Sequence, residues 1–112
     1  MMSDIEKAIN FYRDKAKEYS IAMSQREYLR EFRKSKKAML MIQAEKGGIT
    51  AVSKQEVFAY AHPEYIQLLD GIKAAVEQEA YLRHITTAAK LRIEVWRSQE
   101  ATKRTERHGY GA

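Results

Sequence analysis

The sequence predicts an all-α protein in which two long helices form an antiparallel hairpin with a short helix between them. The 112 residues include one proline and five glycines, too few to separate many short strands. Two serine-led capping-box patterns mark helix starts, and apolar residues recur at helical spacing over long uninterrupted stretches. The length suits one domain, so we expect a single helical domain over residues 1–112.

The first helix is expected at about residues 4–46. Ser3–Glu6 has a capping-box pattern, and Gly47-Gly48 is the next helix stop. The early apolar seam follows the four-three spacing of a coiled-coil core. Its members are Ile5, Ile9, Tyr12, Ala16, Tyr19 and Met23. The same spacing then reaches basic residues, so we expect the buried face to shift near Ala22–Tyr28.

A short helix is expected at residues 54–61 and a third helix at residues 63–104. Ser53–Glu56 has the second capping-box pattern. His62-Pro63 separates the two helices, because proline disfavours helix in the preceding residue and suits a first helical turn. The seam of the third helix consists of Tyr65, Leu69, Ile72, Val76, Leu82, Ile85, Ala89, Ile93 and Trp96. The tail, residues 105–112, is expected to fray.

The hairpin is expected to be completed by dimerisation into a helical bundle. Each of two long helices in a hairpin buries one seam, and this small buried apolar surface gives an isolated hairpin little stability. A second copy would supply the missing surface. We therefore expect a homodimer that uses the seam from Ile5 to Met23 and its partners on the third helix.

The net charge of +5 is unevenly distributed. Residues 26–37 carry six basic and two acidic side chains, and residues 83–112 carry seven basic and three acidic ones. Blocks of this kind indicate partners rather than fold. Two sets are therefore candidate contacts for nucleic acid or for an acidic protein partner. The 26–37 stripe consists of Arg26, Arg30, Arg33 and Lys37, and the C-terminal basic group consists of Arg97, Lys103, Arg104 and Arg107.

Each basic set also has an ordinary structural explanation. A hairpin folded about residue 55 places position n opposite roughly position 110 − n. The 26–37 stripe would then lie near Asp70, Glu77 and Glu79 and be neutralised within the chain. The C-terminal basic group is either a phosphate-binding surface or a solubilising terminus. Trp96 and Tyr110 could stack on bases, although Trp96 also belongs to the predicted seam.

No residue pattern for catalysis or metal binding is present. The sequence lacks a phosphate-binding loop, a nucleophile elbow, an H-E-x-x-H motif and the Glu-x-x-His pairs of di-metal bundles. We therefore expect no enzyme, metal, cofactor or small-molecule substrate. Cysteine is absent, and the longest apolar run, Ala38–Ile42, is far shorter than the roughly 20 residues that span a bilayer. We expect a cytoplasmic protein without a membrane partner.

The segment Glu79–Arg104 resembles the C-terminal helix of small, uncharacterised helical proteins encoded by bacteriophages and prophages. The resemblance covers about a quarter of the chain and transfers no functional residues. It rests on Tyr81-Leu82-Arg83, Ala88-Ala89, Arg92-Ile93 and Trp96-Arg97. It implies a bacterial cytoplasmic setting and a role in phage DNA metabolism.

Two functions are consistent with these observations. The first is a non-enzymatic binding or assembly protein that acts on DNA, or on a DNA-processing complex, through basic helix surfaces. The second is a protein-only helical scaffold or inhibitor that docks on a partner enzyme. The salt dependence of binding distinguishes the two functions, because phosphate contacts make affinity fall steeply with ionic strength.

Overall fold

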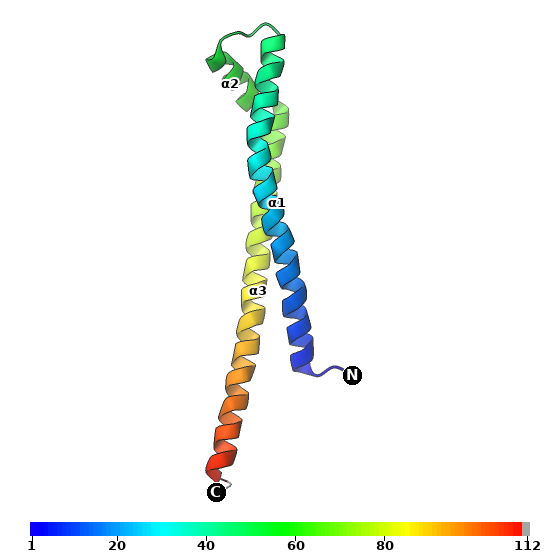
Figure 1. Ribbon diagram of the computed structural model, residues 1–112, viewed down its shortest axis with the longest axis vertical. Coiled ribbons are helices and arrows are strands. Elements are labelled where there is room, and N and C mark those ends of the chain that lie inside the picture. The colour runs from blue at the N-terminus through cyan, green and yellow to red at the C-terminus, as the bar shows by residue number, and fades with distance from the viewer. Residues whose placement is uncertain (111–112) are drawn as a thin grey trace. The chain divides into compact units, whose positions relative to one another are not determined.

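The computed structural model describes the backbone of residues 1–110 and the side chains of residues 1–109. Within this part of the chain all regular structure is helical (Figure 1). The helices are α1 (Asp4–Lys46, 43 residues), α2 (Val52–Ala61, 10 residues) and α3 (Pro63–Tyr110, 48 residues). The predicted all-α class, with a long helical hairpin and a short helix between its arms, is confirmed.

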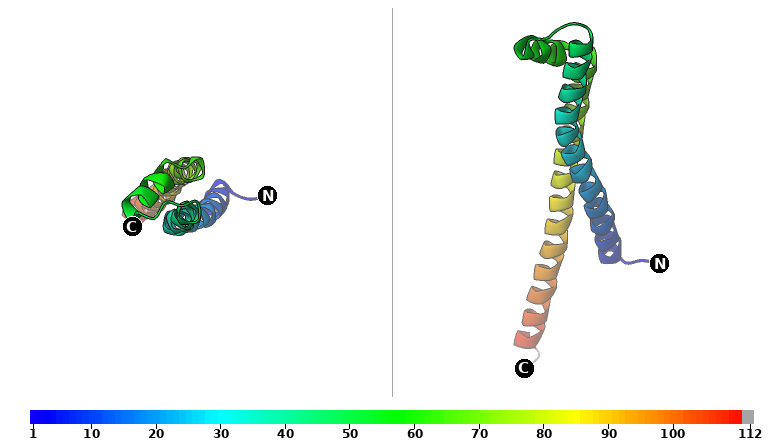
Figure 2. Two further views of the ribbon diagram at one scale, coloured as in Figure 1. Left: turned by 90° about the horizontal axis from the view of Figure 1, so that it is seen from above. Right: turned by 45° about the horizontal axis from the view of Figure 1, so that its top comes forward.

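The chain divides into two compact units, each containing parts of both long helices. Ile21–Glu79 comprises the second part of α1, all of α2 and the start of α3, and is called the three-helix unit. Met1–Ser20 and the residues from Ala80 onward form the two-helix unit. Within each unit, the α1 and α3 segments run antiparallel beside each other (Figure 1 and Figure 2).

The first predicted capping box forms and the second does not. The backbone N–H of Glu6 donates to Ser3 Oγ at 3.3 Å, and the N–H of Ser3 donates to Glu6 Oε2 at 3.1 Å. By contrast, α2 begins at Val52, and Ala51 caps it without a side-chain hydrogen bond. The first intrahelical bonds of α2 reach back to Ala51 O. Ser53 therefore lies inside the first turn, where its hydroxyl is too late in the chain to cap the helix.

The predicted stop at Gly47-Gly48 is formed by a Schellman motif. Gly48 has a positive φ of 101°, a conformation that costs glycine little. The N–H of Ile49 donates to Ala44 O and the N–H of Gly48 donates to Glu45 O, each at 3.0 Å. These bonds satisfy carbonyls that the last turn of α1 leaves unpaired.

His62 and Pro63 separate α2 from α3 as expected. His62 is extended, with φ −67° and ψ 136°, and α3 starts at Pro63. The backbone N–H of Glu64 donates to His62 Nδ1 at 3.1 Å, so the imidazole caps the new helix.

The far end of α3 extends beyond the predicted boundary. Helix was expected to end near Arg104, but it continues to Tyr110. No glycine or proline interrupts the sequence between Gly71 and Gly109, so nothing stops the helix locally. Within the expected frayed tail, residues 105–110 are thus helical, whereas residues 111–112 lie outside the described part.

The buried face of α1 differs from the predicted seam by a small shift. Ile9 and Met23 are exposed at 39% and 41%, whereas Ala8 and Ala22 are buried. The small alanine side chains allow close helix approach. In the three-helix unit, buried and half-buried positions continue at regular spacing through Ala22, Arg26 and Leu29. Farther along, Leu29, Phe32 and Leu40 are buried or half-buried, whereas Arg30 and Arg33 are exposed. The buried face thus moves away from the basic positions, as predicted, although Arg26 itself stays in the seam.

Most of the predicted α3 seam is buried or half-buried. These residues are Tyr65, Ile72, Val76, Leu82, Ile85, Ala89 and Ile93. Leu69 and Trp96 are more exposed, at 40% and 42%. Glu79 is buried although it was not assigned to the seam. Its burial requires a charged partner.

The three helices meet around Leu40. This side chain is 1% exposed and packs in one cluster with Ala59 of α2 and Tyr65 of α3. The buried Gln55 side chain donates from Nε2 to Ile49 O at 2.8 Å. This bond ties the α1–α2 connection to α2, so the short helix completes the core of the three-helix unit.

Candidate functional site

The 26–37 stripe is not a single free basic surface. Arg26 and Lys37 form ion pairs, whereas Arg30 and Arg33 are exposed and form none with other described residues. The stripe therefore contains two cations that are already in ion pairs and two that could contact a partner.

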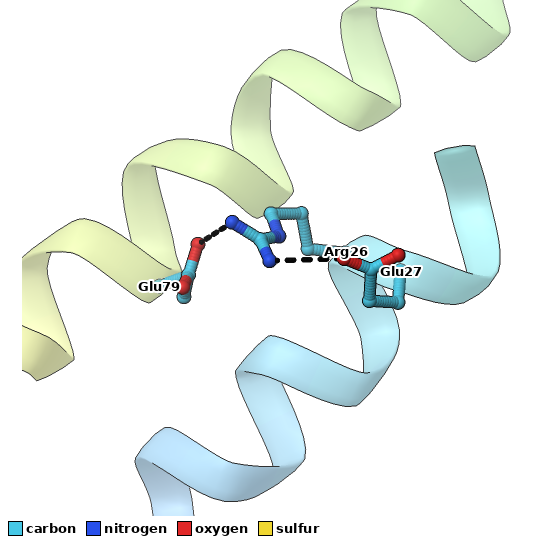
Figure 3. Close-up of polar contacts among 3 residues, drawn as sticks. All are labelled: Arg26, Glu27 and Glu79. Atoms are coloured by element: carbon cyan, nitrogen blue, oxygen red, sulfur yellow. Dashed lines mark hydrogen bonds and ion pairs between the residues drawn. The ribbon is translucent and has the colours of Figure 1, made fainter. Parts of the chain in front are cut away.

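Arg26 lies in the helix seam between two carboxylates (Figure 3). Its Nη1 atom is 2.8 Å from Glu79 Oε2, and its Nη2 atom is 3.1 Å from Glu27 Oε1. The side chains of Arg26 and Glu79 are 20% and 5% exposed, and Arg26 Nε has no hydrogen-bond partner among the described residues. A cation already neutralised and largely removed from water gains little from a phosphate.

Lys37 is held by α2. Its Nζ atom lies 3.7 Å from Glu56 Oε1 and 4.8 Å from the centroid of the Tyr60 ring. Interaction with the Tyr60 side chain contributes most to raising the pKa of Lys37 above its ordinary value; Glu56 adds to the effect, while desolvation opposes it. Lys37 therefore stays protonated at neutral pH and is occupied within the chain.

The observed pairs correct the expected hairpin register. Arg26 pairs with Glu79, and Lys36 Nζ lies 3.3 Å from Glu64 Oε2. Facing positions thus sum to 105 and 100 rather than roughly 110. The hairpin is therefore centred near residues 50–53, at the start of α2, rather than at residue 55. Of the three predicted acidic partners, Glu79 is correct, whereas the exposed Asp70 and Glu77 form no ion pair with other described residues.

A row of four basic side chains follows α3 through the two-helix unit. They are spaced seven residues apart, and all are exposed. None forms an ion pair with another described residue. Seven residues are nearly two helical turns, so the row extends about 32 Å along one side of the helix. The row, called the α3 basic row, consists of Arg83, Lys90, Arg97 and Arg104.

Sequence reasoning found half of this row. Arg97 and Arg104 belonged to the predicted C-terminal basic group, but Arg83 and Lys90 were missed. The signal that could have found them is the constant interval of seven residues. The nearest acidic residues in sequence are Glu94, Glu100 and Glu106. Glu100 pairs with Lys103, and Glu94 and Glu106 form no ion pair with a described residue.

The remaining C-terminal residues are largely accessible. Lys103 Nζ lies 3.4 Å from Glu100 Oε1, and Arg107 is exposed without an ion pair among the described residues. In the two-helix unit, this end of α3 continues beyond the start of α1 (Figure 1 and Figure 2). Trp96 is 42% exposed beside Arg97. The expected stacking role of Tyr110 concerns a side chain outside the described residues.

No group of three or more His, Cys, Asp or Glu side chains that could hold a metal occurs among the described residues. Over the same part of the chain, no helix is both long enough and apolar enough to cross a membrane.

No protein-family model, curated protein or solved structure matches this chain.

Proposed function

We propose that this chain is a non-enzymatic binding or assembly protein that acts as a homodimer and holds nucleic acid by its phosphates along the α3 basic row. One observation carries the proposal. Four exposed cations stand at equal intervals on one helix, and none is paired with another described residue. The resemblance of Glu79–Arg104 to phage-encoded proteins supports a setting in phage DNA metabolism.

Free cations gain most from phosphate contact. Each phosphate neutralised on double-stranded DNA releases condensed counterions, so log K falls by about 0.9 per contact for each unit of log salt. Four contacts would therefore weaken binding roughly 150-fold between 50 and 200 mM salt. Contacts from Arg and Lys to phosphate carry no sequence information by themselves, so we expect binding with little sequence preference.

The test neutralises the α3 basic row as a whole. The variant carries Arg83→Gln, Lys90→Gln, Arg97→Gln and Arg104→Gln. Fluorescence anisotropy with single- and double-stranded DNA at 50 and 200 mM salt should show at least a hundredfold loss of affinity at the lower salt and a much flatter salt dependence.

A matched control removes the same total charge from exposed cations elsewhere. It carries Lys7→Gln, Arg13→Gln, Lys17→Gln and Lys54→Gln, all at positions without ion pairs among the described residues. The control should keep most of the affinity and the salt dependence. Equal losses in both variants would show that net charge rather than the row drives binding. No binding by the wild type at 50 mM salt would overturn the proposal.

A second candidate function is the protein-only scaffold or inhibitor. The observation that favours it is the number of large apolar side chains left exposed, including Ile21, Val57, Leu91 and Val95, since contiguous exposed apolar surface marks protein contacts. Capture of partners from a bacterial lysate with and without nuclease separates the functions. Partners that survive nuclease favour the scaffold, whereas partners lost with nuclease favour the nucleic-acid proposal.

A further inference from the structure

Within the three-helix unit, α1 carries a second apolar stripe, most of whose large side chains are exposed. Its positions alternate four and three residues apart, the spacing of a coiled-coil seam. Ile21, Tyr28, Met39 and Ile42 are exposed at 57%, 66%, 49% and 52%. The surface, called the outer stripe, consists of Ile21, Gln25, Tyr28, Phe32, Ser35, Met39 and Ile42.

The outer stripe is distinct from the packing face of α1. At 100° per residue, its centre lies about 110° around the helix from the buried Ala22 and Leu40. The side chains of α1 that contact α2, such as Lys37, also lie on the side of the helix opposite the outer stripe. The rings of Tyr28 and Phe32 stack with centroids 6.1 Å apart and planes 14° apart. They form an aromatic ridge in which Tyr28 is 66% exposed and Phe32 is half-buried.

The groove on one side of the ridge is lined by uncharged residues. This shallow groove of about 260 Å³ runs between α1 and α3, and no charged side chain lines it. On the α3 side, its wall is made of small or neutral residues. The lining consists of Ala22, Gln25, Leu29, Gly71, Ala74, Ala75 and Gln78.

We infer that the outer stripe is the surface through which two copies of this chain associate, with their α1 helices antiparallel about a two-fold axis at Phe32. This inference rests on the proposed homodimer and gives it a surface. The stripe is nearly self-complementary in this arrangement: Phe32 meets Phe32, and position n lies level with position 64 − n of the second copy. Ile42 of the second copy is therefore within one residue, about 1.5 Å along the helix axis, of the level of Ile21. Ser35 of the second copy lies equally close to the level of Tyr28, where the two hydroxyls can hydrogen-bond. An isologous contact requires this reciprocity.

Electrostatics also favours a second copy on this face. The exposed Arg30 and Arg33 lie on the side of α1 away from the outer stripe, about 130° to 170° around the helix from its centre. Two helices in contact through the stripe keep these cations about 20 Å apart, beyond the Debye length of about 8 Å at physiological salt. Contact through the opposite side would bring like charges together. For a chain of net charge +5, the outer stripe minimises that repulsion.

The arrangement differs from the homodimer expected from sequence. That expectation used the seam from Ile5 to Met23, but Ile5, Tyr12 and Tyr19 are half-buried in the described chain. A seam already used within the hairpin has less apolar surface to offer a second copy. In the outer stripe Phe32 is half-buried, whereas the other large apolar side chains are 49% to 66% exposed and remain available to a second copy.

The first test measures molecular mass by light scattering at micromolar concentration. The wild type should give about twice the chain mass of 13.0 kDa. Tyr28→Glu/Met39→Glu places charge on two exposed positions of the outer stripe and should raise the dimer dissociation constant at least a hundredfold. Val57→Glu/Ile66→Glu, which changes exposed apolar residues elsewhere in the same unit, should remain dimeric.

The possible results distinguish the outer stripe as the contact surface from the homodimer itself. A monomeric wild type overturns both the homodimer and its surface. A dimeric wild type whose Tyr28→Glu/Met39→Glu variant is equally dimeric overturns the outer stripe alone. Circular dichroism of each variant verifies that it remains helical. If the glutamate variant loses helix, Tyr28→Ser/Met39→Ser is measured in its place. This variant should also weaken the dimer, because it removes apolar contact area from the outer stripe.

The natural absence of cysteine permits a second test of direction. Phe32→Cys should form a disulfide-linked dimer on oxidation. Ile21→Cys alone should not, because positions 21 of antiparallel copies lie about 32 Å apart, whereas a disulfide needs Cα atoms within about 7 Å. An equimolar mixture of Ile21→Cys and Ile42→Cys should cross-link. Cross-linking of Ile21→Cys with itself would overturn the antiparallel arrangement.

Discussion

The two compact units contain segments of the same two long helices but use their charges differently. In the three-helix unit, cations of α1 pair with acids from other helices, as Arg26 does with Glu79 and Lys37 with Glu56. In the two-helix unit, the ion pairs between described residues are local, one turn apart on a single helix, as in Lys15–Glu18. Two basic blocks that look alike in sequence therefore differ in availability.

Packing shows the same contrast. Leu40, Ala59 and Tyr65 bring all three helices into one cluster in the three-helix unit. In the two-helix unit, the buried apolar residues are Ala8, Leu82 and Ala89, two of them small. Stability should therefore depend most on the three-helix unit, and binding on the two-helix unit. Substitutions in matched pairs can test this division.

The largest effect is expected for Leu40→Ala. Leu40 is 1% exposed, and truncation of a buried leucine costs about 2–5 kcal/mol through lost burial and the cavity left behind. Urea unfolding at fixed protein concentration should show this loss. Leu91→Ala makes the same change at a 54% exposed position of the two-helix unit and should cost under about 0.5 kcal/mol. Equal losses of unfolding free energy in the two variants would contradict the difference in packing between the two units.

A smaller loss is expected for Glu79→Ala. The substitution leaves Arg26 largely buried beside Glu27 alone, and breaking a buried pair is costly because the remaining charge stays desolvated. Since Arg26 is partly exposed, we expect about 2 kcal/mol in the same unfolding measurement.

Replacing both members of this pair gives the sharper comparison. Arg26→Met/Glu79→Leu should come within about 1 kcal/mol of the wild type, because apolar replacements of a buried pair are often neutral or stabilising. If the double variant is less stable than Glu79→Ala, the ion pair stabilises the fold by more than the neutralisation of two buried charges.

The smallest effect concerns helix capping. Ser3→Ala removes the hydroxyl that accepts from Glu6 and should cost about 1 kcal/mol or less. Ser53→Ala, in the capping pattern that does not form, should leave stability unchanged. Hydrogen exchange at the start of α1 should rise for Ser3→Ala. An equal loss from Ser53→Ala would show that its hydroxyl stabilises α2 by another contact.

Sequence reasoning recovered the features that depend on local chemistry. The box at Ser3–Glu6, the stop at Gly47-Gly48 and the break at His62-Pro63 involve hydrogen bonds and steric limits within a few residues. It failed at Ser53–Glu56, because the turn after α1 had already started α2 at Ala51. It also recovered half of the α3 basic row.

The sequence by itself determined the helical class, the helix breaks and the two basic blocks, since each follows from local conformational preference or from composition. Tertiary structure decided which cations are paired. A facing residue depends on how the segment between α1 and α3 folds back, and no local pattern specifies that path. The turn after Gly48 brings Glu79 to Arg26, and α2 brings Glu56 to Lys37, while the α3 basic row has no such acid within 4.0 Å among the described residues.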